Sequence, residues 1–306
     1  MNQFQWFSKK MIAFGVALIL AVGVLAGCGS EEDVIRVGSK DFTEQLLLGQ
    51  IAIVALEDAG YQVEDKTGVA GSDKVRSALI NDEIDLYWEY TGTAWLMHLQ
   101  NDEPITDYEE CYQKVKEADA EAGLVWLDYA PFNNTYTIML RREESEALGI
   151  QTISELAAYV NENANDLVFA ADHEFTARPD GLPALEELYG FQFNPEKINV
   201  MDMGIVYKVL KEKQADAGMG FATDARIEAF DLVNLEDDKK FFPVYNPAVV
   251  IREEVLDAHP DLADIFNEIA KKLDTETMIR LNYEVDIEER DPRDVAEEWL
   301  KAEGLI

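Results

Sequence analysis

The chain has 306 residues, with 61 acidic against 26 basic side chains and a formal net charge of −35. A surface this negative repels a phosphate backbone, which excludes nucleic-acid binding as a first hypothesis. Hydrophobic residues make up 48% of the chain and aromatic residues 10%, which is enough for a packed core and too much for an intrinsically disordered protein. The length suits one large or two medium domains.

The N-terminus has the pattern of an export signal. Two lysines precede a nearly unbroken apolar run, Met11 to Ala26, which is short for a membrane span. The small residues before Cys28 resemble the lipobox of bacterial lipoproteins, in which the cysteine becomes the acylated N-terminus. We therefore expect residues 1–27 to be a lipoprotein signal peptide, Cys28 to carry the lipid anchor on the outer face of the cell membrane, and residues 28–33 to form a short tether. An uncleaved anchor helix is the alternative.

The cysteines and histidines give no sign of a metal site. If Cys28 is lipidated, Cys111 is left alone, so we expect neither an intramolecular disulfide nor a thiolate cluster. Cys111 lies in an acidic, helical-looking stretch, Asp107 to Ala122, and we expect it to be a small buried side chain. The histidines lack the spacing of metal ligands, and no metal or other cofactor is expected. They are His98, His173 and His259.

The rest of the chain alternates between strand and helix patterns. A short strand, Val34 to Val37, precedes a helix with apolar residues from Phe42 to Ala55, for which Ser39 and Thr43 are candidate N-cap residues. The alternation predicts βαβ units and a parallel-type sheet. Further strands are expected at 63–69, 84–90, 124–127 and 135–140, with helices at 74–80, 153–161, 182–189 and 206–213 and from 263 onward, interrupted near Asp291-Pro292.

Two segments of the chain match each other. In each, a helix leads through an aspartate to a strand that reaches an aromatic residue five positions later, followed closely by a threonine. The first pair is Asp85 and Tyr90, and the second is Asp216 and Phe221. Ligands bind at the carboxyl ends of strands in open α/β sheets, so the match predicts two similar lobes that each present an aromatic ring there. A chance match of two helix–turn–strand units is the alternative.

The sequence carries no motif for catalysis. It has no G-x-S-x-G nucleophile elbow, no Walker loop and no glycine-rich dinucleotide fingerprint. Most of the many acids are expected to form a solvated face. We therefore predict a binding protein and not an enzyme.

Several strings resemble the substrate-binding lipoproteins of osmoprotectant ABC transporters, which bind glycine betaine, proline betaine, carnitine or choline. The most specific are S-K-x-F-T-E-Q at residues 39–45 and E-Y-T-G-T at residues 89–93. Matching strings follow in the family's order, so the resemblance spans essentially the whole mature chain. They lie at 132–136, 175–181, 221–224 and 242–245.

The resemblance implies an α/β, two-lobed fold like that of periplasmic binding proteins, with two hinge crossovers and the ligand in the interlobe cleft. Lobe I is expected to comprise residues 34–131 plus 246–306, and lobe II residues 132–245. The crossovers are expected near 132–135 and 242–245. A ligand that touches both lobes stabilises the closed state in proportion to its differential contacts.

The resemblance also implies an aromatic box for a quaternary ammonium group. A trimethylammonium cation has no hydrogen-bond donor, and it binds to aromatic faces whose quadrupoles attract it. The family's box carries over onto Tyr90, Tyr136 and Tyr245, and onto Phe221 where relatives usually have tyrosine. Each ring taken singly is better explained as ordinary core, whereas four matched positions favour a ligand site.

The family's carboxylate-binding positions match Lys40, Thr93 and Arg178. An arginine fork with a lysine point charge suits a carboxylate, so we expect betaine-type zwitterions to be preferred over choline. The alternative is that nearby acids neutralise the two cations. Candidates for this are Asp41, Asp172 and Glu174.

One departure from the family pattern lies beside this site. Trp88 stands where relatives commonly have proline, and it and Tyr87 either reshape the pocket or simply pack.

The resemblance further implies that the closed, monomeric protein docks on a membrane permease and that a separate ATPase drives uptake. Two alternatives remain: a choline-preferring receptor on the same scaffold, and a lipoprotein sensor that signals instead of delivering solute.

Overall fold

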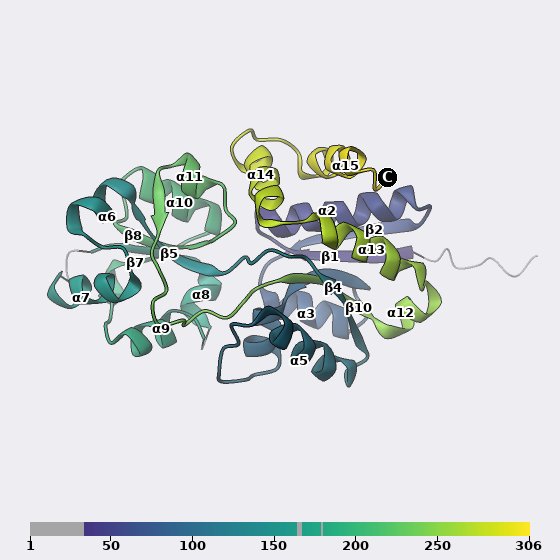
Figure 1. Ribbon diagram of the computed structural model, residues 1–306, viewed down its shortest axis with the longest axis horizontal. Helices are drawn as coiled ribbons and strands as arrows, with labels where there is room; N and C mark the ends of the chain where they lie inside the picture. The colour runs from purple at the N-terminus through teal and green to yellow at the C-terminus, as the bar shows by residue number, and fades with distance from the viewer. Residues whose placement is uncertain (1–33, 164–166, 179) are drawn as a thin grey trace, which may run out of the picture. The chain divides into compact units, whose positions relative to one another are not determined.

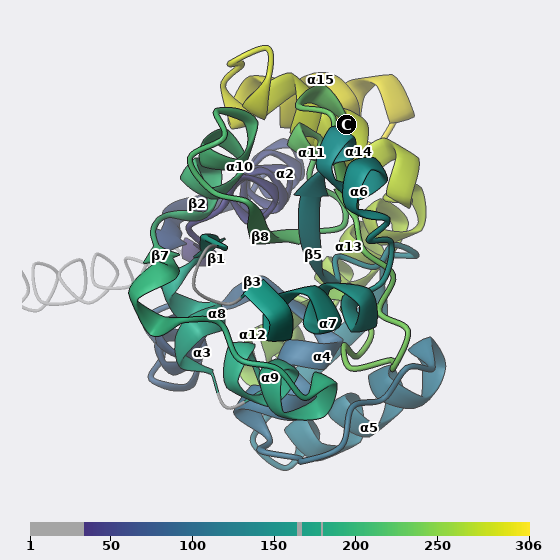
Figure 2. The ribbon, with the colours of Figure 1, turned by 90° about the vertical axis from the view of Figure 1, so that its left-hand side faces the viewer.

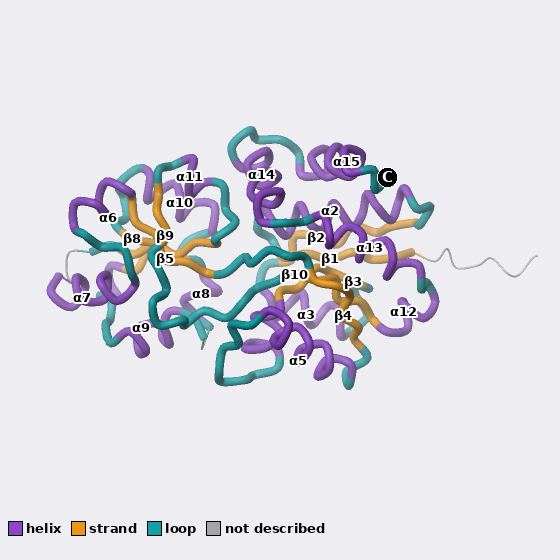
Figure 3. Tube along the Cα trace, in the orientation of Figure 1, coloured by secondary structure: helices purple, strands orange, loops and turns teal. Residues whose placement is uncertain are grey.

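The computed structural model describes residues 34–163, 167–178 and 180–306. The chain divides into a short N-terminal unit that ends at Val34 and a body from Ile35 to Ile306. The predicted signal peptide, Cys28 and the tether lie outside the described residues. The body has two lobes, each built on its own five-stranded sheet (Figures 1 and 3). Within the described part of the chain, no helix has the length and apolar character needed to cross a bilayer.

The sheet of lobe I has the strand order β2-β1-β3-β10-β4. Strands β1 and β3 are parallel, whereas β10 is antiparallel to both β3 and β4. The strands are β1 Val34–Lys40, β2 Gln62–Val69, β3 Leu86–Tyr90, β4 Leu124–Tyr129 and β10 Pro247–Arg252. The helices are α2 Thr43–Asp58, α3 Ser72–Ile80, α4 Thr91–Thr93, α5 Tyr108–Ala120, α12 Glu253–Ala258, α13 Asp261–Lys272, α14 Thr275–Asp286 and α15 Pro292–Glu303, with a π-helical turn, η1, at Ala94–His98.

Lobe I buries two hydrophobic clusters, one on each face of its sheet. Helices α2, α13, α14 and α15 enclose the larger cluster, in which Trp88 and Trp299 are buried. Helices α3 and α5 cover the other cluster, which contains Tyr87, Trp126 and the free Cys111. Cys111 is fully buried, which confirms the expectation of a small buried side chain, and burial raises the pKa of its thiol to about 11.

The sheet of lobe II has the strand order β7-β6-β8-β5-β9. Strand β6 is parallel to β7 and β8, whereas β5 is antiparallel to β8 and β9. Helices lie on both sides of this sheet, with α10 on one side and α9 on the other (Figure 2). The strands are β5 Tyr136–Arg141, β6 Phe169–Ala171, β7 Ile198–Val200, β8 Ala217–Phe221 and β9 Leu232–Asn234. The helices are α6 Arg142–Leu148, α7 Ile153–Asn163, α8 His173–Ala177, α9 Leu182–Tyr189, η2 Pro195–Lys197, α10 Met203–Lys211 and α11 Arg226–Ala229.

Two details of the sequence prediction are wrong. The sheets are mixed instead of parallel, because β5 and β10 follow the crossovers and enter their sheets antiparallel to β8 and β3. The N-cap of α2 is Phe42, without a side-chain cap bond, and neither Ser39 nor Thr43. Thr43 is the first helical residue, and its hydroxyl donates to Asp286 at 2.7 Å.

The match between the two segments is confirmed. Each aspartate leads into a five-residue strand whose last residue is the aromatic one, Tyr90 in β3 and Phe221 in β8. Each of these strands pairs with the antiparallel strand that follows a crossover. Tyr90 lies opposite Pro247, and Phe221 lies opposite Tyr136.

The two crossovers run beside each other and are hydrogen-bonded together. The Asn134 backbone N–H donates to the Tyr245 carbonyl at 3.1 Å, and the Asn246 side-chain amide donates to the Phe132 carbonyl at 2.7 Å. Two chain segments held together in this way form a compact hinge between the sheets. The lobe boundaries after 131 and 245 stay a prediction.

Candidate functional site

Aromatic rings from both lobes meet where β3 and β8 end. Phe42 stacks on Phe221 with the ring centroids 4.9 Å apart, and its centroid lies 6.3 Å from that of Tyr90. The centroid of Tyr136 lies 5.2 Å from that of Phe221 and 5.4 Å from that of Tyr245. The four rings named from the sequence therefore belong to one connected cluster, with Phe42 between two of them.

Backbone pairing explains why these rings meet. Tyr136 and Phe221 are direct partners in the β5–β8 ladder, and such partners hold their side chains within contact distance. Gly92 lets the second crossover pass close to the end of β3, because a Cβ there would lie 2.6 Å from the Val244 carbonyl oxygen. This close approach places Tyr245 beside the cluster.

Three further rings belong to the cluster and were not singled out from the sequence. They are Phe42, Phe175 and Phe242; the centroids of the last two lie 5.3 and 5.9 Å from that of Tyr136. All three lie inside the strings that carry the family resemblance, which is the signal that identifies them. The cluster is thus larger than a four-ring box.

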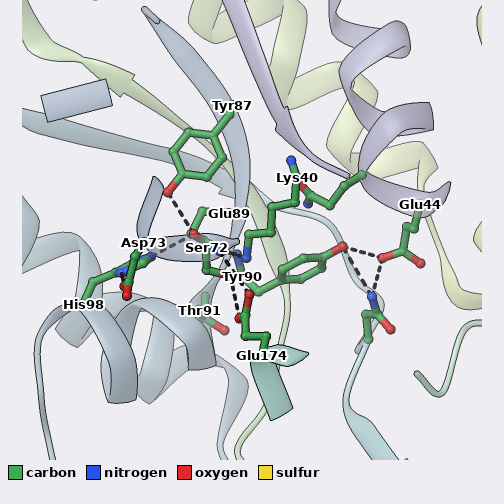
Figure 4. A network of polar contacts seen from close by, with 12 residues as sticks. Lys40, Glu44, Ser72, Asp73, Tyr87, Glu89, Tyr90, Thr91, His98 and Glu174 are labelled. Carbon is green, nitrogen blue, oxygen red and sulfur yellow. Dashed lines mark hydrogen bonds and ion pairs between the residues drawn. The ribbon is translucent and has the colours of Figure 1, made fainter. Parts of the chain in front are cut away.

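Lys40 is buried at the end of β1 and paired with an acid of β3, the neighbouring strand in the sheet. Its ammonium lies 2.6 Å from Glu89 Oε1 and 5.0 Å from the ring centroid of Tyr90. The Glu89 carboxylate also accepts from the Tyr87 hydroxyl at 2.8 Å and lies 3.0 Å from His98 Nε2 (Figure 4). Burial alone would raise the pKa of Glu89, but Lys40 and His98 outweigh it and hold that pKa well below its usual range.

Arg178 is buried directly after α8, with its guanidinium centred 5.5 Å from the Tyr136 ring centroid. Nε and Nη2 donate to the two oxygens of Asp180 at 2.8 and 2.5 Å. Nη1 donates to Glu174 at 3.1 Å and to the Tyr136 hydroxyl at 3.2 Å. The arginine fork is therefore bound by Asp180.

Thr93 is the third residue predicted to contact a ligand carboxylate. It is buried in α4, three residues after Tyr90.

Acids pair with both cations, and Glu174 is the one of the three named acids that takes part. The assignment of Lys40, Thr93 and Arg178 to a ligand carboxylate stays a prediction. Glu174 pairs with Arg178, whereas Asp172 accepts from the Phe175 backbone N–H as the N-cap of α8. The other partners are Glu89 and Asp180. Glu89 is the first residue of the E-Y-T-G-T string, and Asp180 follows Arg178 by two positions. These positions inside the family strings are the sequence signal that could have identified both acids.

Polar contacts join the two lobes on both sides of the aromatic cluster. On one side, the backbone N–H and hydroxyl of Ser72 donate to Glu174 at 3.1 and 2.8 Å (Figure 4). On the other side, the Thr223 hydroxyl donates to Glu44 at 2.6 Å, and the Arg226 guanidinium lies 3.2 Å from Asp286. These contacts draw the ends of β3 and β8 together.

Two hollows border the cluster. The larger, of about 840 Å³, reaches Tyr136 and Phe242 from the crossover side. The smaller, of about 10 Å³, is lined by Phe42 and Phe221 with polar residues of both lobes. Neither is lined by all four predicted rings, because the rings pack on one another.

Tyr87 and Trp88 lie within the core and not in the cluster. Trp88 is 1% exposed and packs under α2, whereas Tyr87 reaches the site only through its hydrogen bond to Glu89. Among the described residues, no group of three or more histidine, cysteine or acidic side chains is arranged to hold a metal ion.

A sequence model of the substrate binding domain of ABC-type glycine betaine transport systems matches residues 33–302. The chain belongs to this family. It is therefore a substrate-binding protein of an ABC transport system.

Individual relatives agree with this assignment. The chain is 40% identical over 293 residues to a glycine-betaine-binding protein of Pseudomonas aeruginosa, with 94% of each chain covered. It is 34% identical to the carnitine transport binding protein OpuCC of Listeria monocytogenes, with 96% of each covered. The crystal structure of a glycine betaine/carnitine/choline ABC transporter protein superposes with a TM-score of 0.71, at 29% identity over 89% of this chain and 99% of the other.

The Lys40–Glu89 pair generates a stability prediction. Lys40→Met leaves the Glu89 carboxylate buried and without its ammonium, which we expect to cost about 3–5 kcal/mol of unfolding free energy, measured by urea denaturation. Adding Glu89→Gln removes the buried charge that has lost its ammonium partner and should restore most of the loss. A double variant as unstable as Lys40→Met alone would contradict this account of the pair.

Proposed function

We propose that the aromatic cluster binds the trimethylammonium group of a betaine-type solute between the lobes, and that the protein delivers this solute to the permease of its transport system. The observation that carries the proposal is the meeting of Tyr90 from lobe I, Phe221 and Tyr136 from lobe II, and Tyr245 from a crossover. A methylated ammonium offers no hydrogen bond, and faces of aromatic rings are the groups that attract it.

The expected energy is adequate for such a ligand. Each desolvated ring contact contributes about 0.5–2 kcal/mol, so four rings contribute a few kcal/mol. Micromolar affinity requires about 8 kcal/mol, and burial of the three methyl groups supplies part of the remainder. Rings from both lobes reach full contact only when the lobes are together, which links binding to closure.

The charges around the cluster also favour a cationic head group. Two cations, Lys40 and Arg178, face three paired carboxylates, Glu89, Glu174 and Asp180, so this group of five carries 2 − 3 = −1. The Lys40 ammonium has three donors and gives one to Glu89. Its remaining donors, the Thr93 hydroxyl and the positive charge of the Arg178 guanidinium are what we assign to the ligand carboxylate.

The names of the relatives support a ligand with both a methylated ammonium and a carboxylate. Glycine betaine and carnitine, named for the Pseudomonas and Listeria proteins, share these two groups. A choline-preferring receptor is the second candidate, and the pairing of Lys40 and Arg178 with acids is the observation in its favour.

We infer from the sequence that the protein acts outside the cytoplasm as a monomer, anchored by a lipid on Cys28. The basic, apolar and small-residue segments that precede this cysteine support the anchor. Two or more acyl chains hold a protein stably on a membrane, which keeps it near its permease.

Substitution at Phe221 tests the aromatic site. Phe221→Leu keeps an apolar side chain and removes the π face, so we expect glycine betaine to bind about 5- to 30-fold more weakly in calorimetric titration. Phe221→Tyr is the matched control, because it keeps the ring and should bind at least as tightly as the wild-type protein. Equal affinities of the leucine variant and the wild type would contradict the proposal.

Substitution at Arg178 separates the two ligand candidates. Arg178→Ala removes the guanidinium at the proposed carboxylate end, and we expect it to abolish binding of glycine betaine while choline still binds, as measured by calorimetry. Choline is the internal control for folding, because it needs the ring cluster but not the carboxylate contact. Equal losses for both ligands would contradict the two-ended site.

A further inference from the structure

Glu44 connects the aromatic cluster to the contact between the lobes. It lies in the first turn of α2 and is 3% exposed. Its Oε1 accepts from the Tyr90 hydroxyl at 2.7 Å and from the Asn134 side-chain amide at 2.8 Å. Its Oε2 accepts from Thr223 of lobe II at 2.6 Å and from Asn282 of α14 at 3.1 Å. One carboxyl thus contacts both lobes and a crossover, and Figure 4 shows it at the hydroxyl of Tyr90.

If Glu44 is ionised, this network has too few hydrogens for its acceptors. The Thr223 hydroxyl has one hydrogen, and two acceptors compete for it, Glu44 Oε2 at 2.6 Å and Asn134 Oδ1 at 2.9 Å. The orientation of the Asn134 amide is fixed, because its NH₂ group donates to Glu44 Oε1 and its carbonyl oxygen therefore faces Thr223 as an acceptor. A proton on Glu44 Oε2 solves the conflict, because Glu44 then donates to Thr223 and Thr223 donates to Asn134.

The charges around Glu44 also disfavour its ionised form. No ion pair among the described residues includes Glu44, and Arg226, which lines the same small hollow, is bound to Asp224 and Asp286. These three are the charged groups that face Glu44 from lobe II and α14, and Tyr90 is the titratable group that faces it from β3. Burial raises the pKa of Glu44 to about 7, despite the hydrogen bonds from Thr223, Tyr90 and Asn282 that lower it.

We propose that Glu44 is a positioning residue for ligand capture: in the closed arrangement it carries a proton, holds the Tyr90 ring and joins Thr223 across the lobes, so that closure on the ligand takes up one proton. The proposal rests on the function proposed above, because it concerns the same aromatic site. Opening separates Thr223 from Glu44 and admits water, and the carboxyl then loses its proton at an ordinary pH for glutamate.

Calorimetric titration with glycine betaine, in buffers of different ionisation enthalpy, tests the coupling. We expect uptake of nearly one proton at pH 6 and almost none at pH 8.5, with affinity about tenfold tighter at pH 6. Glu44→Gln mimics the neutral carboxyl and should remove both the proton uptake and the pH dependence. Glu57→Gln, the same change at the exposed end of α2, should behave as the wild type. Equal wild-type affinity at the two pH values, or an unchanged pH dependence in Glu44→Gln, would overturn the proposal.

The same titrations separate this proposal from the proposed function. Glycine betaine that binds the wild type with equal affinity at both pH values would overturn the role of Glu44 and leave the ligand assignment standing. Absence of glycine betaine binding at both pH values would overturn the proposed function itself.

Discussion

The proposed function depends on one constraint, which is that a methylated ammonium cation has no hydrogen-bond donor to offer the protein. Such a group is attracted to aromatic faces, and a single face contributes little, so several rings must converge. Here the convergence follows from the architecture, because β3 and β8 end in aromatic residues and each pairs with a strand that follows a crossover. The two-lobed fold therefore brings rings from both sheets into one connected cluster.

Charge balance is the second constraint on the site. In a chain with a formal net charge of −35, both buried cations of the site are paired with carboxylates, Lys40 with Glu89 and Arg178 with Asp180. Glu44 differs from these acids, since it is buried, contacts only neutral donors and has no ion-pair partner among the described residues. A carboxyl in that environment favours its neutral form, which makes it sensitive to pH near neutrality.

The sequence predicted the two-lobed α/β fold and the matched aromatic strand ends, because both follow from local periodicity and from strings specific to the family. It did not predict β10, although Ala248 to Ile251 is an apolar run, since periodicity alone does not distinguish a short continuous apolar run in a strand from one in a buried helix. It also missed Glu89 and Asp180 as partners of the two cations. With 61 acids in the chain, spacing alone does not show which ones are buried.

The central claim is that the positive charge of the ligand, and not only its shape, is recognised by the rings. Glycine betaine and 3,3-dimethylbutanoate have the same shape and the same carboxylate, and differ only in nitrogen against carbon at the branched centre. The most direct measurement is the affinity of both for the same protein by calorimetry. The account predicts that the carbon analogue binds at least about tenfold more weakly, which corresponds to about 1.4 kcal/mol of cation–π attraction. Equal affinities would show that the cluster selects size alone and would contradict the account.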